Sequence, residues 1–546
     1  MRHSHPGQSR CGHSRPNTRL LRAARICLCL SACLYLCACS FPGGGEPPAP
    51  STQTAADVDE PFRIASQDAE EAGLAKPATV IGYLLGPEPE DMDAITDAVN
   101  VRLVKDMNTR LELHFINWGD IASRYPLILS AGEGVDWIYT ANWNHYYDEA
   151  MKGSFLEMTD DMLSRWMPNH MAATPKAAWQ DARIDGHVYM IPTATPDTKY
   201  PVMLIREDLR RKYGVPDFNR FTDLEPYLAA IAANEPGMVP LNLDNGYDVL
   251  TCRQSLMGED GFMPGVVCGG VTYNIEDPGY RVVSFLDEPA LSSLRKAALV
   301  MKDWYDKGYV NANPFANNVR SKESFQEGKS AVGLGNLYDV DANILMAENA
   351  GYTVKVIPML TKTGRYSRDC YSNNGVAIAA SSRQPERAML VLDRLMEHPV
   401  YNTLVSFGIE GRHYFKTDDN RIRLSTPASG HAPVYTHTGF WFTNKNQWLP
   451  LADWPAQYAD LRTHADGILF DMPLAAFAFS QAEVKDELDQ VSAAFNRYGD
   501  PLAVGAVQDV DETLRVLASV MKSSGVDLVK MAAQSQIDDY LAERGQ

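Results

Sequence analysis

The stretch LELHFINWGDIASRYPLILSAGEGVDWIYTANW, residues 111–143, sets the fold class. LELHF alternates apolar and polar residues and predicts a strand with one buried side. SRYPLILSAGE predicts a short helix that is capped by Ser123 and ends at Gly132. VDWIY, residues 135–139, predicts a second strand, so this stretch reads strand, helix, strand.

The residues before this stretch show the same alternation. TVIGYLLG, residues 79–86, predicts a buried strand that ends in glycine. The next segment has apolar residues at helical spacing, at Met92, Ile95, Val99 and Leu103. Strands that alternate with helices favour a parallel, doubly wound sheet, and ordered structure is expected to begin near Ala78.

The remaining chain continues as a mixture of strands and helices without an internal repeat. Strands are predicted within residues 185–192, 324–336 and 373–380. Helices are predicted within residues 205–215, 289–308 and 384–396. The C-terminus is predicted to be helical, with Val484, Leu488, Val491 and Phe495 on one face and two more helices after Asp509.

The length and net charge of the chain limit the classes of protein to which it can belong. A chain of 546 residues is long enough for at least two lobes. Its formal net charge of −19 argues against a nucleic-acid partner, which requires a basic surface.

The first 38 residues predict a secretory signal. They contain six arginines and no acidic residue, and the apolar run ICLCLSACLYLCAC follows at residues 26–39. That run is too short to cross a bilayer as a mature helix. Residues 39–76, rich in Gly, Pro, Ala, Ser and Thr and then acidic, predict a flexible tether.

The end of this apolar run resembles a bacterial lipobox. In Leu36-Cys37-Ala38-Cys39, Cys39 would be the lipidated residue, although Cys37 occupies a place where a small residue is more usual. Cys33 is the alternative lipidation site, and an ordinary signal peptide with incidental cysteines is a further alternative.

Only three cysteines follow the signal, and they predict no metal site. Cys252 and Cys268 would close a 17-residue loop if they formed a disulfide, and buried thiols are the alternative for these residues and for Cys370. The chain has no CxxC or Cys/His spacing and no HExxH motif. No GxSxG elbow occurs, and GKS at residues 328–330 lacks the first glycine of a phosphate loop. We therefore expect no metal, no cofactor and no catalytic residues.

Loops that combine aromatic and amide side chains are the most distinctive feature of the chain. Tryptophan and tyrosine can cover the apolar face of a sugar, and Asn, Asp and Arg can bond its hydroxyls. In α/β sheets, ligands bind beyond the carboxyl ends of strands, where two of these loops follow predicted strands. The alternative for each tryptophan is a place in the hydrophobic core. The candidate ligand-binding residues are Trp143, Asn142, Trp118, Asn117, Asp120, Asn336, Tyr338, Asn373 and Trp441.

Several strings, in this order, resemble one family. INWGD, LILSAGEGVDWIYTANW, DGHVYMIP, IREDLRRKYGV and FQEGKSAVGLGN are similar to the extracellular solute-binding proteins of carbohydrate-type ABC importers. FGIEGRHY, FWFTN and the C-terminal helices resemble a subgroup with an uncharacterised C-terminal region.

The resemblance implies a two-lobe, type II periplasmic-binding-protein-like α/β fold with a hinge and a C-terminal helical extension. By analogy, lobe 1 would comprise residues 77–192 and 373–414, and lobe 2 residues 196–370 and 420–546. The family's ligand contacts fall on Asn142 and Trp143 from one lobe and on Asn336 and Tyr338 from the other.

The leading hypothesis is a monomeric lipoprotein on the outer face of a bacterial cell membrane. It would capture a sugar or oligosaccharide and deliver it to ABC permease subunits. The alternatives are a secreted carbohydrate-active enzyme, whose two carboxylates no single stretch identifies, and a sensory or peptide-binding solute-binding protein. The sequence does not decide which sugar is bound.

Overall fold

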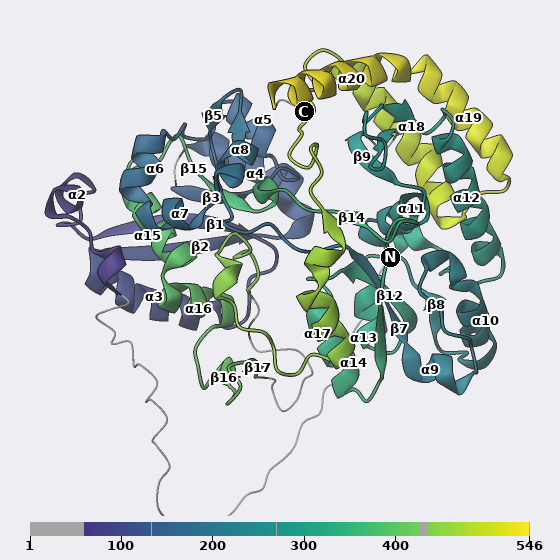
Figure 1. Cartoon of the computed structure of the whole chain (residues 1–546), viewed down its shortest axis with the longest axis horizontal. Coiled ribbons are helices and arrows are strands. Elements are labelled where there is room, and N and C mark those ends of the chain that lie inside the picture. The colour runs from purple at the N-terminus through teal and green to yellow at the C-terminus, as the bar shows by residue number, and fades with distance from the viewer. Residues whose placement is uncertain (1–58, 133, 269, 426–434, 436, 545–546) are drawn as a thin grey trace, which may run out of the picture. The chain divides into compact units, whose positions relative to one another are not determined.

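Two sheets, each with its own hydrophobic core, organise the chain (Figure 1). The computed structural model describes residues 59–132, 134–268, 270–425, 435 and 437–544. The first sheet has the strand order β2 (Thr109–Ile116), β1 (Ala78–Leu85), β3 (Trp137–Thr140), β15 (Gly375–Ile378) and β6 (Ile191–Pro192). The second sheet has the order β13 (Val354–Pro358), β7 (Pro201–Arg206), β12 (Ser330–Asn336) and β8 (Val239–Leu241).

Among the described residues, smaller strands form two antiparallel hairpins, one parallel pair and one three-stranded sheet. They are β4 (Arg183–Ile184), β5 (His187–Val188), β9 (Phe262–Cys268), β10 (Val271–Asn274), β11 (Val283–Ser284), β14 (Tyr366–Ser367), β16 (Tyr414–Lys416), β17 (Ile422–Leu424) and β18 (Leu469–Phe470).

Helices make up most of the remaining structure. In the first half of the chain these are α2 (Ser66–Glu71), α3 (Met92–Met107), α4 (Ile121–Ala131), α5 (Tyr146–Met151), α6 (Asp160–Trp166), α7 (Pro168–Ala173), α8 (Lys176–Asp181), α9 (Glu207–Lys212), α10 (Glu225–Asn234) and α11 (Tyr247–Gly258). The second half contains α12 (Ala290–Asp306), α13 (Ser321–Gln326), α14 (Asp341–Asn349), α15 (Pro385–Glu397), α16 (Pro399–Phe407), α17 (Ala456–Thr463), α18 (Lys485–Val504), α19 (Val510–Ser523) and α20 (Val526–Glu543). Short 3-10 turns are η1 (Glu60–Phe62), η2 (Trp118–Asp120), η3 (Phe221–Asp223), η4 (Pro314–Ala316), η5 (Tyr371–Asn373), η6 (Lys445–Gln447) and η7 (Ala465–Gly467).

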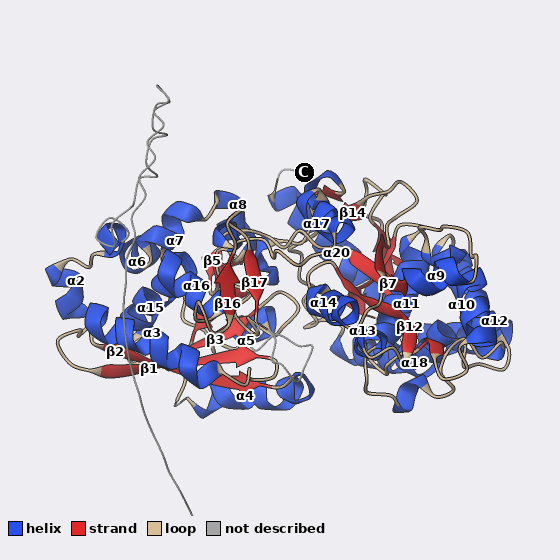
Figure 2. Ribbon diagram, turned by 90° about the horizontal axis from the view of Figure 1, so that it is seen from below, coloured by secondary structure: helices blue, strands red, loops and turns tan. Residues whose placement is uncertain are grey.

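The predicted alternation of strands and helices is confirmed, and helices enclose both sheets (Figure 2). Helix α3 packs on β2 and α15 on β1, whereas α10, α11 and α13 pack on strands of the second sheet. The four apolar residues predicted to share one face of α3 are all buried. Helix α4 begins at Ile121 rather than at the predicted cap Ser123, and it ends at Gly132, whose φ of 68° few other residues adopt.

The first sheet is mixed rather than wholly parallel, which corrects the prediction. Strands β1, β2 and β3 are parallel, but β15 runs antiparallel to β3 and pairs with β6. The reason is connectivity, because β15 returns from the second set of elements instead of following a helical crossover from β3.

The C-terminal helices continue the second hydrophobic core. Helix α18 packs against α11, α12 and α19, and α20 packs against β10 and β11. The predicted apolar face of α18 is confirmed, since Val484, Leu488, Val491 and Phe495 are buried.

The lobe boundaries predicted from the sequence stay a proposal. The packing of the described residues refines them in two places. Tyr435, Phe440 and Phe442 lie in the core of the first sheet although the prediction assigned them to lobe 2. Ala72 and Leu74 are buried in the same core although the prediction assigned residues 39–76 to a flexible tether. Cys252 and Cys370 are buried free thiols. Cys39 and Cys33, the lipidation candidates, lie outside the described residues.

Candidate functional site: a tryptophan surface beside two pockets

The loops that follow β1, β2 and β3 meet at one edge of the first sheet. Leu85 pairs with Ile116 at the ends of β1 and β2, and Gly86 donates its N–H to the Ile116 carbonyl at 2.9 Å. Trp118 begins η2 directly after β2, and Trp143 follows β3 by three residues. Parallel strands place their carboxyl ends at the same edge, so the two loops become neighbours as predicted.

A third tryptophan, from a distant part of the chain, joins them. The rings of Trp118 and Trp441 stack with centroids 5.7 Å apart and an interplanar angle of 20°. Trp118 and Trp143 lie 6.5 Å apart. Trp118 is 52% exposed and Trp143 is 50% exposed, although both lie beside a well-packed sheet. We call these three residues the tryptophan surface.

Hydrogen bonds hold Trp143 in place. Its indole Nε1–H donates to the Asn373 carbonyl at 2.9 Å, and the backbone N–H of Asn142 donates to the Ser372 carbonyl at 2.8 Å. Beneath the loop, the buried Tyr139 hydroxyl donates to Asn374 Oδ1 at 2.8 Å. The loop after β3 is therefore fixed to the segment that leads into β15, which limits its movement before any ligand binds.

A pocket of about 510 Å³ lies beside Trp441. We call it the Trp441 pocket, and its wall combines side chains from β12–α14, from residues 435–451 and from α17. Its lining includes Lys322, Tyr338, Asp339, Asp341, His437, Trp441, Lys445, Trp448, Trp454 and Arg462.

A second pocket of about 550 Å³ lies beside Trp143. We call it the Trp143 pocket, and its lining includes Asn142, Trp143, Tyr273, Arg368, Asp369, Asn373 and Phe477. The side-chain oxygen of Asn142 is buried without a hydrogen-bond partner, while its Nδ2 donates to Cys370 Sγ at 3.1 Å. A buried acceptor without a partner is costly, so a ligand hydroxyl at this position would be stabilising.

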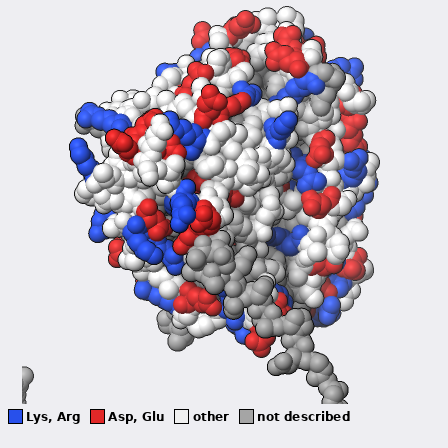
Figure 3. All heavy atoms as spheres, turned by 60° about the vertical axis from the view of Figure 1, so that its left-hand side comes forward, with Lys and Arg blue, Asp and Glu red and all other residues white. Residues whose placement is uncertain are grey.

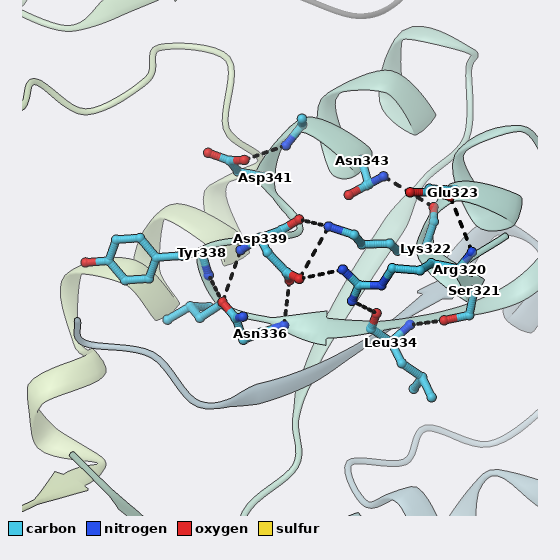
Figure 4. Close-up of polar contacts among 12 residues, drawn as sticks. Arg320, Ser321, Lys322, Glu323, Leu334, Asn336, Tyr338, Asp339, Asp341 and Asn343 are labelled. Carbon is cyan, nitrogen blue, oxygen red and sulfur yellow. Dashed lines mark hydrogen bonds and ion pairs between the residues drawn. The ribbon is translucent and has the colours of Figure 1, made fainter. Parts of the chain in front are cut away.

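Tyr338 projects from the turn after β12, and Figure 4 shows its ring pointing away from the Asp339 cluster. Its hydroxyl lies 3.0 Å from Thr198 Oγ1. Asp339 accepts hydrogen bonds from Arg320 at 3.1 Å and from the Asn336 N–H at 2.7 Å. The pKa of Asp339 is lowered because Lys322 and Arg320 together outweigh the effect of its burial.

A buried ion network spans the segment between β6 and β7. Asp197 is bonded by Lys199 at 2.8 Å, by Asn374 Nδ2 at 3.0 Å and by Lys445. Burial raises the pKa of Asp197, but the two lysines outweigh burial and hold this pKa below its usual value of 3.8. The network ties residues 435–448 to the chain that connects the two sheets.

Of the remaining predicted residues, Asn117 and Asp120 are at the exposed end of a strand, whereas Asn336 stabilises a turn. Asn117 and Asp120 flank Trp118 at the exposed end of β2, and Asp120 lies 3.9 Å from Arg124. The Asn336 side-chain oxygen accepts the N–H groups of Tyr338 and Asp339, so it shapes the turn.

Sequence reasoning did not single out Arg462, His437, Trp454 or Asp197. No pattern in the sequence selected them, because none of them belongs to a loop that combines aromatic and amide side chains. Only folding places them beside such loops. Trp448 lies in the same aromatic and amide segment as Trp441, GFWFTNKNQW at residues 439–448.

One face of the described residues carries mixed charge rather than a basic patch (Figure 3). Figure 3 shows Lys and Arg interspersed with Asp and Glu over one face. Within the described residues, no group of three or more His, Cys, Asp or Glu has the arrangement of a metal site. None of the described helices has both the length and the apolar character of a membrane span.

Comparison with known proteins supports the resemblance given by the sequence. The C-terminal residues 473–542 match a domain of unknown function, DUF3502. The chain is 21% identical over 474 residues to a carbohydrate ABC transporter substrate-binding protein of Streptococcus pneumoniae, covering 85% of this chain and 91% of that protein. A shorter match, 30% identical over 127 residues, involves the polygalacturonan/rhamnogalacturonan-binding protein YtcQ of Bacillus subtilis and covers 22% of this chain and 25% of YtcQ.

Solved structures share the fold at low sequence identity. The N-glycan transport solute-binding protein NgtS of Streptococcus pneumoniae superposes with a TM-score of 0.70 at 20% identity, over 86% of this chain and all of NgtS. The alginate-binding protein AlgQ2 superposes with a TM-score of 0.60 at 16% identity, over 85% of this chain and 98% of AlgQ2. The chain therefore has the type II periplasmic-binding-protein fold with a C-terminal helical extension, and its predicted resemblance to carbohydrate ABC solute-binding proteins is confirmed.

Proposed function

We propose that this protein captures a carbohydrate and delivers it to the permease of an ABC importer. The observation that carries the proposal is the tryptophan surface, in which Trp118 and Trp143 are half-exposed, beside two pockets lined by side chains from both halves of the fold. Exposed indoles cost free energy in water, and a sugar's C–H face can cover them while its hydroxyls reach the polar pocket walls.

The names of similar proteins support a saccharide ligand. NgtS has been crystallised in complex with Man1GlcNAc and with Man5GlcNAc. The match to YtcQ and the structural likeness to AlgQ2 concern proteins named for binding polysaccharides. An oligosaccharide suits the two pockets here, since their volumes of about 510 and 550 Å³ exceed the need of a single sugar ring.

The proposed contacts divide by role. Trp143, Trp118 and Trp441 cover sugar faces, whereas Asn142 and Tyr338 bond hydroxyls. Asn373 positions Trp143 through its carbonyl, and Asn336 positions Tyr338 through its turn. Asn117 and Asp120 complete the polar rim beside Trp118.

Capture involves closure of the two lobes about the crossing segments near residues 193–200 and 367–374. Contacts that a ligand makes with both lobes stabilise the closed state, which the permease then recognises. The protein acts as a monomer at the outer face of the membrane, anchored through a lipid on Cys39, and it has no catalytic role.

Titration calorimetry against neutral, acidic and peptide ligands tests this function. Saturable binding of at least one glycan at micromolar Kd or below is expected, with no binding of peptides. Peptide binding without glycan binding would overturn the assignment. Chromatography of each glycan after incubation distinguishes the enzymatic alternative, which requires shortened products.

A further inference from the structure

Arg462 occupies an unusual position in the wall of the Trp441 pocket. It projects from α17, and its guanidinium carbon lies 3.8 Å from the Tyr338 ring centre and 4.6 Å from that of Trp454. Its Nη1 donates to the Tyr458 hydroxyl at 3.1 Å. Contact with two rings restrains the guanidinium, and its N–H groups remain as its polar edge.

This cation has no anionic partner in the described part of the chain. No carboxylate oxygen there lies within 4.0 Å of an Arg462 nitrogen. Arg320 provides the contrast, since it stacks on Tyr247 at 3.8 Å but also bonds Asp339 at 3.1 Å (Figure 4). Partly buried charges are ordinarily paired, so the open edge of Arg462 favours an anion from outside the chain.

Asp341, the carboxylate whose charge acts on Arg462, does not fill that role. Asp341 also lines the pocket, and its Oδ1 accepts the N–H of Ala342 at 2.7 Å. Burial raises the pKa of Asp341 despite the opposing effect of Arg462. Asp341 therefore acts on Arg462 at a distance and does not form an ion pair with it.

Other groups in the same wall lack hydrogen-bond acceptors. The indole nitrogens of Trp448 and Trp454 are buried with no partner. His437 lies beside Trp448 with ring centroids 4.7 Å apart, and burial together with Lys445 and Arg462 lowers its pKa to about 4. A ligand rich in acceptor oxygens would satisfy such donors.

The charges of the pocket lining favour an anion. Lys322, Lys445 and Arg462 lie in this lining with Asp339 and Asp341, and Lys445 is already paired with Asp197. Asp339 is shared, because Lys322 lies 3.3 Å and Arg320 lies 3.1 Å from the same carboxylate oxygen. Among the described residues of the lining, Arg462 is therefore the cation that no ion pair neutralises.

We propose that the Trp441 pocket takes a uronic acid residue of an oligosaccharide, with its carboxylate on Arg462. The inference rests on the proposed carbohydrate-binding function and specifies its ligand as an acidic saccharide. The planar guanidinium matches a carboxylate in a two-bond arrangement, while Trp441 covers the sugar ring.

A matched pair of ligands tests the inference. One is an oligosaccharide that contains glucuronic acid, and the other is the same oligosaccharide after its carboxyl groups have been reduced to primary alcohols. Calorimetry at low salt is expected to give a Kd about 10- to 100-fold lower for the acidic form. Added salt should weaken its binding more than that of the reduced form.

Three variants identify the residue responsible. Arg462→Gln should bring the ratio of the two Kd values close to one, and Arg462→Lys should leave an intermediate ratio because it keeps the charge without the planar fork. Arg365→Gln is the matched control, since Arg365 also stacks on an aromatic ring, Phe470 at 4.6 Å, but lines neither pocket. Thermal unfolding checks that each variant folds.

The outcomes separate this inference from the general function. Equal or tighter binding of the reduced ligand overturns the acidic-sugar inference and leaves carbohydrate capture intact. A preference for the acidic ligand that persists in Arg462→Gln also overturns it. Binding of neither ligand overturns it as well, and the wider glycan panel then decides whether carbohydrate capture fails too.

Discussion

Replacing Trp143 with alanine should weaken glycan binding far more than it weakens the fold. A tryptophan side chain contributes about 150–250 Å² of surface, and Trp143 is 50% exposed. Covering about 100 Å² of indole at ~25 cal/mol per Å² gives about 2.5 kcal/mol, which is about 60-fold in Kd. That value applies when a sugar covers the whole exposed face, so the expected loss is about 10- to 60-fold.

The loss of folding free energy caused by Trp143→Ala should be smaller than the loss of binding free energy, and the two can be measured separately. The Nε1–H bond to the Asn373 carbonyl, 2.9 Å long, is worth about 0.5–1.5 kcal/mol of folding free energy. Trp143→Phe removes the bond but keeps an aromatic ring, so it should retain most of the affinity. Calorimetry with the best glycan, together with urea unfolding, measures both quantities.

Phe415 provides the control for surface aromatic character. It is 51% exposed, nearly the same fraction as Trp143, but it lies on β16 and lines neither pocket. Phe415→Ala should leave Kd unchanged. If Trp143→Ala binds glycan within about twofold of the wild type, or if Phe415→Ala loses as much affinity, the argument from the tryptophan surface is refuted.

Three further changes test the fold and its ionisable groups. Gly82→Ala should lower the free energy of unfolding by about 1–3 kcal/mol, because a Cβ there would overlap the Trp137 ring. Gly237→Ala is the control and should not lower it, because a Cβ at Gly237 would meet open space. Urea titration compares the two variants. Asp197→Asn should cost about 3 kcal/mol at pH 7, because Lys445 loses its carboxylate partner and Lys199 keeps only Asp369. Its folded pKa is lowered, so the stabilising contribution is present above pH 3.8 and is lost as pH falls further; an equal deficit well below pH 3.8 would contradict this. The pKa of His437 is about 4 in the folded state against 6.5 in the unfolded state, so the free energy of unfolding should decrease as the pH is lowered from 6.5 to 4. His437→Asn should remove up to about 1.4 kcal/mol per pH unit of this dependence, as measured by unfolding titrations.

Much of the fold could be predicted because its signals are local. The alternation in residues 111–115 and the helical spacing from Met92 to Leu103 each depend on neighbours within a few residues. The antiparallel direction of β15 could not be predicted in this way. It depends on where the chain returns after leaving the first sheet.

The candidate site, like the fold, could be predicted only where its signals are local. The loops with Trp118 and Trp143 could be placed together from the sequence, since both follow parallel strands that the pattern predicts. Their contact with Trp441 joins residues about three hundred positions apart, and no local pattern encodes that approach.

By itself the sequence determined the alternating elements, the C-terminal helices and the aromatic loops, because hydrophobic periodicity and turn residues act over short distances. Only the tertiary structure decided that Arg462 lies between Tyr338 and Trp454 and that Trp441 stacks on Trp118. The physical reason is that burial and charge pairing depend on which distant side chains surround a group, and folding alone brings those side chains together.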